Sequence, residues 1–304
     1  MSAAPVTVRA AAKINLCLGV GPVRDDGYHA LATVYQAIGM YDDVTATEAD
    51  GWSLRVSAHE RIDVTEVPLD DSNIALRAGR LLASHHGLDR AAALDIDKGI
   101  PVAGGLAGGS ADAAATLLAL DRLWRLDTPD EELLRLAGEL GSDVPFALLG
   151  GTARGDGHGE QVTRVADAGS WWWVVVESDI GLSTPRIYAE LDQMRGDAVP
   201  DPEVSVALLD ALAAGDSTAL AGALTNDLQE PALHVRPDLR DVLALGVAAG
   251  ALQGLVSGSG PTCVLLCADH ESAQSVRAVL HAAGHERVQV ATGPVAGAHV
   301  VTYA

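Results

Sequence analysis

Alternating apolar and polar positions dominate the beginning of the chain, a pattern typical of β-strands. Turn residues divide this region into expected strands at residues 6–10, 14–20, 31–40, 43–48 and 52–56. Between the second and third of these, residues 21–31 contain glycine, proline and aspartate and predict a long hairpin loop. The spacing then becomes helical at residues 72–87, where Ser72 is the expected N-cap and Gly87 the expected end.

Strand and helix patterns continue to alternate after this helix. A strand is expected at 92–97, then a glycine-rich loop, then a helix from Ser110. A further helix is expected at 128–140, with Thr128 as its N-cap and Pro129 at its first helical position. The first half of the chain therefore mixes strands and helices around one glycine-rich loop.

The pattern loosens around residues 160–170, which suggests two domains, 1–160 and 161–304. The apolar run at 171–177 contains three tryptophans and predicts a strand buried on both faces. The remaining elements are expected as helices at 183–194, 203–215, 216–224, 236–250 and 270–284, and as strands within 254–268 and at 287–293. Two successive α+β layers are the predicted fold class.

Composition limits what the chain is expected to bind. Forty-one acidic residues against 20 basic ones give a formal charge of −21, and no basic run interrupts this, so nucleic acid and anionic membranes are not expected partners. The longest apolar run, 243–256, is too short to span a bilayer. Cys17, Cys263 and Cys267 form no CxxC pair, and we see no signal-peptide pattern, so we expect a reduced, cytoplasmic setting.

The segment PVAGGLAGGSADAA, residues 101–114, carries the clearest chemical pattern. Its glycines allow positive φ and a close backbone approach to a ligand, and the helix that follows offers unpaired N–H groups and a positive dipole end. Together these favour an anion, most naturally the phosphates of a nucleotide. A structural turn between strand and helix is the alternative. The spacing of a dinucleotide-binding loop and the lysine of a Walker A loop are both absent.

At this point the chain resembles the GHMP kinases, a family of small-molecule kinases. Residues 101–114 are similar to the family's phosphate loop, AAKINLCLGV at 11–20 to its first motif, and GLVSGSGPTCVLL at 254–266 to its third. The stretches RDDGYHAL, DSNIALRA and LGSDVPFAL resemble the branch that phosphorylates the 2-hydroxyl of 4-diphosphocytidyl-2-C-methyl-D-erythritol, in the methylerythritol phosphate route to isoprenoid precursors. The resemblance implies a ribosomal-S5-like ATP domain over 1–160, a ferredoxin-like α/β domain over 161–304, and ATP and Mg²⁺ as cofactors.

The resemblance also implies the residues of the site. Asp143 matches the catalytic aspartate of the family, and Lys13 matches the lysine beside it. The implied substrate-binding residues are Asn15, Tyr28, His29, Thr184 and Tyr188, with Tyr28, His29 and Tyr188 around the cytosine. The implied nucleotide-binding residues are Asn73, Lys98, Pro101, Val102, Ala103, Gly104, Gly105, Leu106, Ala107, Gly108, Gly109, Ser110 and Ala111. The family loop often ends in two serines, whereas here Ser110 is the single hydroxyl for phosphate or metal, and no acid is assigned to Mg²⁺.

Phosphoryl transfer requires positioning and charge stabilisation, and Asp143 and Lys13 have suitable chemistry. A carboxylate against the acceptor hydroxyl orients it and accepts its proton, while a nearby ammonium favours the ionised carboxylate. Alternatively, Asp143 is the N-cap of a helix that starts at Val144, because proline follows at the second helical position. Lys13 is alternatively a surface lysine, although lysine occurs only there and at Lys98.

Two alternatives remain open for the function. Another GHMP kinase, of the homoserine or mevalonate type, would not need the base-binding residues Tyr28, His29 and Tyr188, which would then be ordinary packing residues. A non-catalytic nucleotide- or RNA-binding module is the second alternative, and the charge of −21 disfavours RNA. Residues 257–260 are either a hairpin turn or a second backbone approach to the acceptor's phosphates. The sequence allows a monomer or a homodimer.

Overall fold

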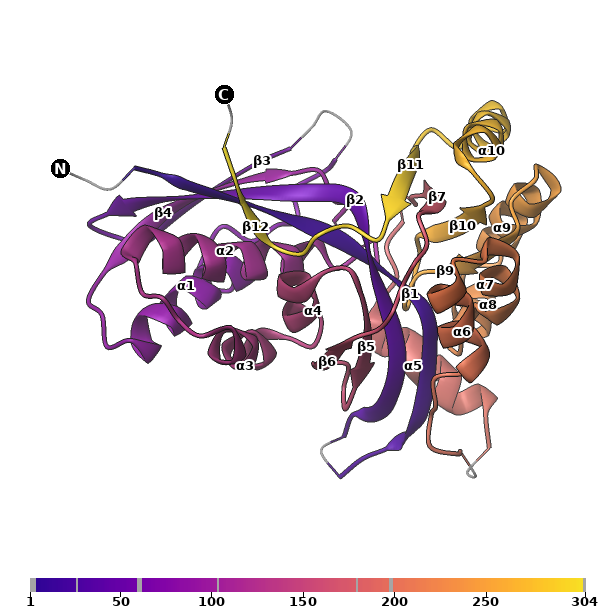
Figure 1. Ribbon diagram of the computed structural model, residues 1–304, viewed down its shortest axis with the longest axis horizontal. Coiled ribbons are helices and arrows are strands. Elements are labelled where there is room, and N and C mark those ends of the chain that lie inside the picture. The colour runs from indigo at the N-terminus through magenta and orange to yellow at the C-terminus, as the bar shows by residue number, and fades with distance from the viewer. Residues whose placement is uncertain are drawn as a thin grey trace.

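The computed structural model describes residues 4–25, 27–58, 62–102, 104–178, 180–196 and 199–302. Ala103, expected in the phosphate loop, lies outside the described residues. Figure 1 shows two sheets with helices packed on each, joined by the long strands β1 (Val6–Val23) and β2 (His29–Ala49). This arrangement confirms the predicted α+β class.

The strands β1 and β2 form one antiparallel hairpin. The sequence predicted two shorter strands in place of each, and this was wrong because the ladder continues through the expected breaks. Register shifts lie between Ala11 and Ala12 and between Asn15 and Cys17. Such irregularities bend and twist a strand without ending it, and here the bent hairpin reaches from the larger sheet to the smaller one (Figure 1).

The larger sheet follows the order β12-β1-β2-β4-β3, with β5 beside β2 and β6, and β8 beside β1. Helices α1 to α4 lie on one side of it (Figure 1). The bounds are β3 (Ser53–Ala58), β4 (Ala91–Lys98), β5 (Thr152–Asp156), β6 (Gln161–Arg164), β8 (Thr225–Asn226), β12 (His299–Val301), α1 (Ile74–His85), α2 (Gly108–Trp124), α3 (Asp130–Leu140) and α4 (Val144–Leu149).

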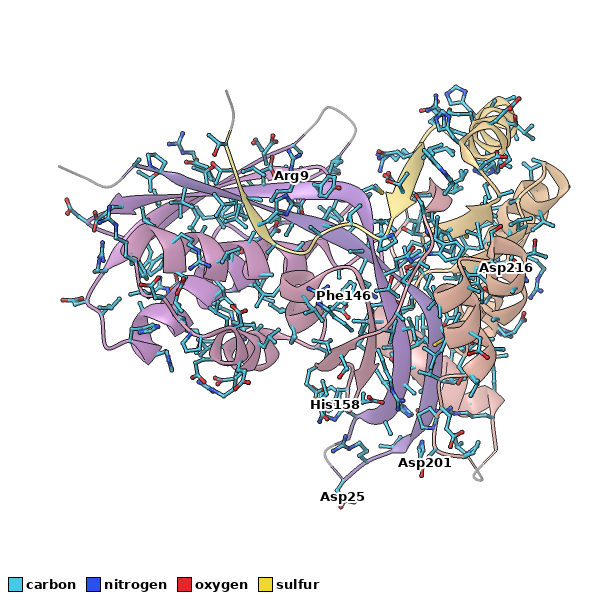
Figure 2. The ribbon with its side chains drawn as sticks, viewed as in Figure 1. Arg9, Asp25, Phe146, His158, Asp201 and Asp216 are labelled. Atoms are coloured by element: carbon cyan, nitrogen blue, oxygen red, sulfur yellow. The ribbon has the colours of Figure 1, made fainter. Side chains whose placement is uncertain are left out.

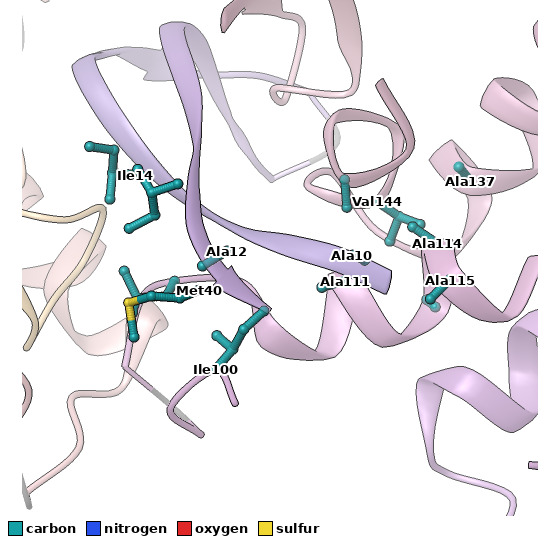
Figure 3. Close-up of a cluster of buried hydrophobic side chains, with 14 of the residues drawn as sticks. Ala10, Ala12, Ile14, Met40, Ile100, Ala111, Ala114, Ala115, Ala137 and Val144 are labelled. Carbon is teal, nitrogen blue, oxygen red and sulfur yellow. The ribbon is translucent and has the colours of Figure 1, made fainter. Parts of the chain in front are cut away.

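Small side chains let α2 approach this sheet closely. Ala111, Ala114 and Ala115 are fully buried, and Figure 3 shows them in one cluster with Ala10 and Ala12 of β1. Alanine is the strongest helix former and adds little bulk, so the helix can lie directly against the strands. The N-terminus of α2 is therefore held firmly beside β1.

The smaller sheet is antiparallel and has the order β11-β7-β10-β9. Its strands are β7 (Trp171–Val176), β9 (Gln253–Val256), β10 (Cys263–Cys267) and β11 (Val288–Gly293). The accompanying helices are α5 (Thr184–Met194), α6 (Val206–Ala214), α7 (Ser217–Ala223), α8 (Gln229–Val235), α9 (Asp238–Ala248) and α10 (His270–Ala282). All predicted strands and helices of this half are present, while α8 was not predicted.

The strand β7 is buried on both faces, as its continuous apolar sequence predicted. Trp173 and Val175 belong to the core cluster shared with the larger sheet, whereas Val174 and Val176 belong to a second cluster with α5 and α10. The indole of Trp173 donates a hydrogen bond to Oε1 of Gln36 on β2, at 2.9 Å. The smaller sheet is therefore packed firmly against the hairpin.

Two short strands return from the second half of the chain to the larger sheet. β8 pairs in parallel with β1 at Cys17 and Leu18, and β12 pairs with the same edge of β1 nearer its start, at Thr7–Arg9, while β2 occupies the opposite edge. Neither was predicted, because strands of two or three residues carry no periodicity. The pairing of β6 with β5 extends the larger sheet as far as Arg164. The division between residues 160 and 161 stays a prediction.

Two expected helix caps differ in the structure. Asn73, not Ser72, caps α1, because its side-chain oxygen accepts the N–H of Ala75 at 2.9 Å. Pro129 occupies the N-cap position of α3. The hydroxyl of Thr128 instead contacts Nε2 of His86. In each case the cap lies one residue later than the sequence pattern indicated.

Within the described residues, no helix combines the length and apolar character needed to cross a membrane. Cys17, Cys263 and Cys267 are free and buried. Burial raises the pKa of Cys17 and of Cys263 to about 12, so both stay protonated near neutral pH. The cytoplasmic setting stays a prediction.

Candidate functional site

A cavity of about 960 Å³ lies where the β1–β2 hairpin, the start of α2 and helix α5 meet. Leu106 and Ala111 do not line it because they are buried in the core, and Ser110 lies outside its lining on the first turn of α2. The expected site residues that line it are Lys13, Asn15, Tyr28, His29, Asn73, Lys98, Pro101, Val102, Gly104, Gly105, Ala107, Gly108, Gly109, Asp143, Thr184 and Tyr188.

Lys13 is buried on β1, with 8% of its surface exposed, so it is not a surface lysine. Its Nζ donates to Oδ1 of Asn15 at 2.8 Å and lies 3.7 Å from Oδ2 of Asp143. Asn15 in turn donates to the hydroxyl of Thr33 at 2.8 Å. Lys13 and Asn15 share one face of β1, because they lie two positions apart on a strand. The ammonium is therefore held in place from its own strand.

Asp143 stands at the N-cap position of α4, but its side chain makes no capping hydrogen bond. The carboxylate is 30% exposed and turns toward Lys13 and Tyr35 instead. Burial raises the pKa of Tyr35 well above its usual range, and the charge of Asp143 and a hydrogen bond to it raise this pKa further. Tyr35 therefore keeps its proton and can donate to the carboxylate. The helix fixes the backbone of Asp143 and leaves its carboxylate available to the cavity.

Helix α2 begins at Gly108, two residues earlier than predicted. Ala107 precedes it in the left-handed conformation, with φ 59°, and no side chain caps the helix there. The first N–H groups of α2 therefore lack intrahelical partners and lie at the positive end of its dipole. The backbone N–H of Lys13 donates to the carbonyl of Leu106 at 3.1 Å, which fixes the loop to β1. This arrangement fits the phosphates of a nucleotide.

A second glycine loop, residues 257–260, packs on the first. It forms a tight turn between β9 and β10, and Gly258 and Ser259 also line the cavity. A Cβ on Gly105 would lie 2.7 Å from the carbonyl oxygen of Ser257, and one on Gly258 would lie 3.5 Å from Nζ of Lys13. The two loops can approach this closely only because glycine occupies the contact positions.

Asn226, on β8, holds the second loop in place. Its Nδ2 donates to the carbonyls of Val256 and Gly258, at 2.8 Å each, and its Oδ1 accepts the N–H of Leu228 at 2.9 Å. Asn226 could not be identified from the sequence, because the segment around it shows no periodic pattern. The second half of the chain thus contributes the backbone of the second glycine loop to the cavity. Asn226 holds that backbone in place.

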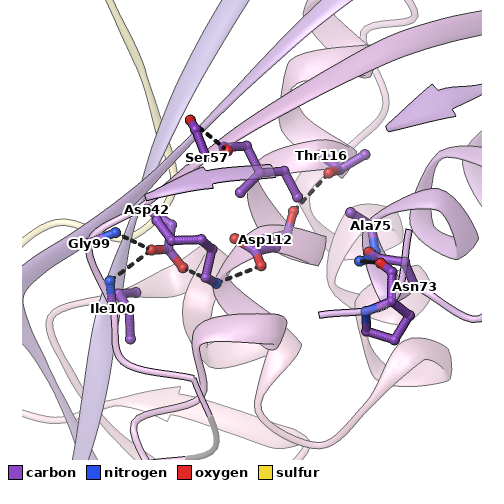
Figure 4. A network of polar contacts seen from close by, with 11 residues as sticks. Asp42, Ser57, Asn73, Ala75, Gly99, Ile100, Asp112 and Thr116 are labelled. Carbon is purple, nitrogen blue, oxygen red and sulfur yellow. Dashed lines mark hydrogen bonds and ion pairs between the residues drawn. The ribbon is translucent and has the colours of Figure 1, made fainter. Parts of the chain in front are cut away.

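Lys98 lines the cavity, but its ammonium is already paired. Nζ lies 2.5 Å from Oδ2 of Asp42 and 2.7 Å from Oδ2 of Asp112, and all three side chains are buried. Figure 4 shows Asp42 also accepting hydrogen bonds from the N–H groups of Gly99 and Ile100. The side chain of Asn73 is also occupied, because it caps α1. The side chains of Lys98 and Asn73 therefore shape the cavity and are not free to bind a nucleotide without rearrangement.

The aromatic residues gather at the other end of the cavity. The ring of His29 stacks on that of Tyr188, with centroids 5.3 Å apart and an angle of 24° between the planes. Tyr28 is 66% exposed, and its ring contacts His158 at 5.2 Å between centroids. Figure 2 shows His158 toward the tip of the β1–β2 hairpin. The three residues expected around the cytosine, Tyr28, His29 and Tyr188, thus lie on the hairpin and on α5, on the lining of one cavity.

Among the residues that the structure describes, no group of three or more His, Cys, Asp or Glu is placed to hold a metal ion. Mg²⁺ usually keeps several waters and is bound through substrate phosphates with one or two protein ligands. The unpaired N–H groups at the start of α2 fit the phosphates of ATP, and Mg²⁺ carried by those phosphates would need no protein cluster. The residues present therefore fit ATP with its metal ion.

Several cavity residues were not identified from the sequence: Tyr35, Asp112 and Asp192. Tyr35 lies in an alternating strand pattern, and its sequence context does not distinguish it from an aromatic residue of the hydrophobic core. Asp192 follows Thr184 and Tyr188 at intervals of four, a spacing that places all three on one helix face. That spacing was present in the sequence and could have indicated Asp192.

The comparisons with known proteins concern both halves of the chain. The family model described as GHMP kinases N terminal domain matches residues 73–151, and that described as GHMP kinases C terminal matches residues 208–286. A 4-diphosphocytidyl-2-C-methyl-D-erythritol kinase of Nocardioides sp. is 60% identical over 98% of this chain and 100% of its own length. That of Thermobifida fusca is 52% identical over 97% of this chain and 98% of its own.

The similarity to a solved structure indicates the same family as these relatives do. The crystal structure of a 4-(cytidine 5′-diphospho)-2C-methyl-D-erythritol kinase superposes with a TM-score of 0.76 at 32% identity, covering 94% of this chain and 98% of the other. A homoserine kinase from Cytophaga hutchinsonii gives a TM-score of 0.74 at 17% identity, over 98% of this chain and 97% of its own, and shows the shared fold alone. The chain therefore belongs to the GHMP kinase family and, within it, to the branch of the 4-diphosphocytidyl-2-C-methyl-D-erythritol kinases.

Proposed function

We propose that this kinase transfers the γ-phosphoryl group of ATP to the 2-hydroxyl of 4-diphosphocytidyl-2-C-methyl-D-erythritol. The observation that carries the proposal is the pair of Lys13 and Asp143, 3.7 Å apart in the cavity that the start of α2 also lines. A carboxylate, an ammonium and a phosphate-binding helix terminus are the parts that phosphoryl transfer to an alcohol requires. The names of the similar enzymes supply the acceptor.

Each residue of the pair has a separate task. Asp143 orients the acceptor hydroxyl and takes its proton as the new bond forms. Lys13, held by Asn15, places a positive charge between the carboxylate and the phosphoryl group. Tyr35 donates to Asp143 and limits the directions in which the carboxylate can turn. ATP supplies the phosphoryl group when bound, and the N–H groups at Gly108 and its neighbours hold its phosphates.

The size and lining of the cavity support a nucleotide-linked acceptor over a small one. About 960 Å³ is at the upper end of the range of small-molecule pockets. Its end beside Tyr188 and His29 is aromatic, which suits a flat base. Homoserine or mevalonate would leave that end unused.

The test is an acceptor panel with the purified protein, ATP and Mg²⁺, with ADP release as the measurement. We expect turnover with 4-diphosphocytidyl-2-C-methyl-D-erythritol and little with 2-C-methyl-D-erythritol 4-phosphate, homoserine or mevalonate. Equal turnover of the methylerythritol phosphate, which lacks the cytidine, would contradict the proposed acceptor.

Asp143→Asn tests the role of the carboxylate. We expect kcat to fall by about 10²- to 10⁴-fold, because the amide cannot accept the proton, while the KM for ATP changes little. Asp89→Asn, at an exposed acid between α1 and β4, is the matched control and should keep normal activity. Retention of normal kcat by Asp143→Asn would refute the assignment.

A further inference from the structure

Helix α5 presents one face to the cavity. Thr184, Tyr188 and Asp192 lie at intervals of four residues, and all three line the cavity. Tyr188 stacks on His29, so the aromatic end of the cavity is bordered by the next turn of α5, where Asp192 lies. Asp192 has no part in the phosphoryl transfer proposed above.

Arg195 fixes the hairpin beside this face. Its guanidinium donates to the carbonyl of Val20 at 2.6 Å and to that of Gly21 at 3.1 Å, and it contacts Nδ1 of His29 at 3.2 Å. Nδ1 also lies 2.9 Å from the carbonyl oxygen of Gly21. These groups occupy the Nδ1 side of the imidazole, so the Nε2 side faces Asp192.

Asp192 retains acceptor capacity for a ligand. Its oxygens lie 3.3 Å from Nε2 of His29 and 3.4 Å from Nη2 of Arg195. Both distances exceed the roughly 2.7–2.9 Å of a strong charge-assisted hydrogen bond. The side chain is 44% exposed and lies on the cavity lining. An ionised carboxylate accepts hydrogen bonds at about four positions and donates none.

We infer that Asp192 is the residue that selects an aminopyrimidine over an oxopyrimidine at this end of the cavity, an inference that rests on the proposed function. The exocyclic amine of cytosine donates to the carboxylate. Uracil presents a carbonyl oxygen at the same position, and its lone pairs would face those of the carboxylate. One well-placed polar contact to a base edge discriminates by about tenfold to a hundredfold, and partial exposure to water keeps the effect within this range.

The experiment measures the dissociation constants of cytidine 5′-diphosphate and uridine 5′-diphosphate by calorimetry. The unmodified protein should prefer the cytidine nucleotide by about tenfold or more. In Asp192→Asn the preference should fall to about threefold or less, because an amide can donate to the uracil carbonyl as well as accept from the amine. Glu190→Gln removes the same charge from the same helix, where the side chain faces His234 instead of the cavity, and should keep the full preference.

The outcomes separate this inference from the proposed function. If Asp192→Asn kept the full preference, or lost affinity for both nucleotides by the same factor, the inference would be overturned and the proposed function would stand. If the unmodified protein bound neither nucleotide, the proposed acceptor itself would be contradicted. Equal melting temperatures of the three proteins confirm that the comparison concerns binding.

Discussion

Asp112 is a buried acid on α2, one turn after the phosphate loop. Burial raises its pKa well above the usual range; Lys98 lowers it, and Asp42 raises it by charge and by a hydrogen bond between the two carboxyl groups. Oδ1 of Asp112 is buried and has no hydrogen-bond partner. A proton on this oxygen, donated to Asp42, would give the atom a hydrogen-bond partner. The group of one lysine and two acids is then neutral beside a loop suited to phosphates.

The pH dependence of folding tests this protonation. The folded-state pKa of Asp112 is raised above the unfolded value of about 3.9, so its contribution to stability is complete below that value and is lost as pH rises through the folded pKa. Asp112→Asn replaces the acid by an amide that donates to Asp42 and accepts from Lys98. We expect its free energy of unfolding, relative to the unmodified protein, to be higher at about pH 8 than at about pH 5, as measured by urea denaturation.

Asp89→Asn provides the control for that measurement, because it removes an acid from an exposed turn. Its free energy relative to the unmodified protein should be nearly the same at both pH values. If Asp112→Asn behaved like this control, Asp112 would be ionised in the folded protein.

At the scale of single residues, the sequence predicted the site residues that lie within a motif. It did not predict contacts between residues that are far apart in the chain. Lys13 and Asn15 share a strand face by simple alternation, and Asp143 comes from a recognisable motif. The ion pairs of Lys98 could not be predicted from the sequence, because its partners Asp42 and Asp112 come from β2 and α2. Pairing of buried charges is decided by tertiary packing, which a single sequence does not display.

At the scale of elements, the two glycine loops depend on one another. Gly105 has φ +79°, a conformation that side chains disfavour, and its Cα faces the second loop. A Cβ there would lie 2.7 Å from the carbonyl oxygen of Ser257 and 3.0 Å from that of Gly260. Gly105→Ala should therefore lower the free energy of unfolding by about 1–3 kcal/mol and reduce activity, as measured by urea denaturation and ADP release.

Gly138→Ala is the matched control for this prediction. Gly138 lies in the helix α3, and a Cβ there would meet nothing within 4 Å. Alanine in a helix stabilises by about 0.4–1 kcal/mol relative to glycine. If both variants gained stability, the two loops would not be in the close contact described above.

Long elements were predictable and their ends were not. The helices α5, α9 and α10 have clear apolar spacing and were found where it predicted them. The breaks expected within β1 and β2 were wrong, because irregular pairing with the partner strand carries the ladder past polar residues. Cap positions moved by one residue because Asn73 and Ser72 are both good caps, and only the packing of α1 selects between them.

At the scale of the whole molecule, the sequence pattern predicted two α+β layers but not how they are joined. The hairpin β1–β2, the strand β8 and the strand β12 each connect the halves, and β8 places Asn226 against the second glycine loop. Such connections arise from non-local pairing of short segments. The cavity therefore contains backbone from both halves, and neither half alone would complete it.

The net charge of −21 leads to a last prediction, about how ATP reaches this cavity. A polyanionic nucleotide is repelled by the acidic molecule at long range and held by the start of α2 and Lys13 only at short range. Salt screens the long-range part, because the Debye length falls from about 30 Å at 0.01 M to about 8 Å at 0.15 M. The association rate constant of a fluorescent ATP analogue, measured by stopped flow at fixed free Mg²⁺, should therefore rise by about two- to fivefold over this range. Adenosine, which is uncharged, should show no such rise. A rate constant that falls with salt would mean that the positive site, not the acidic surface, governs the approach.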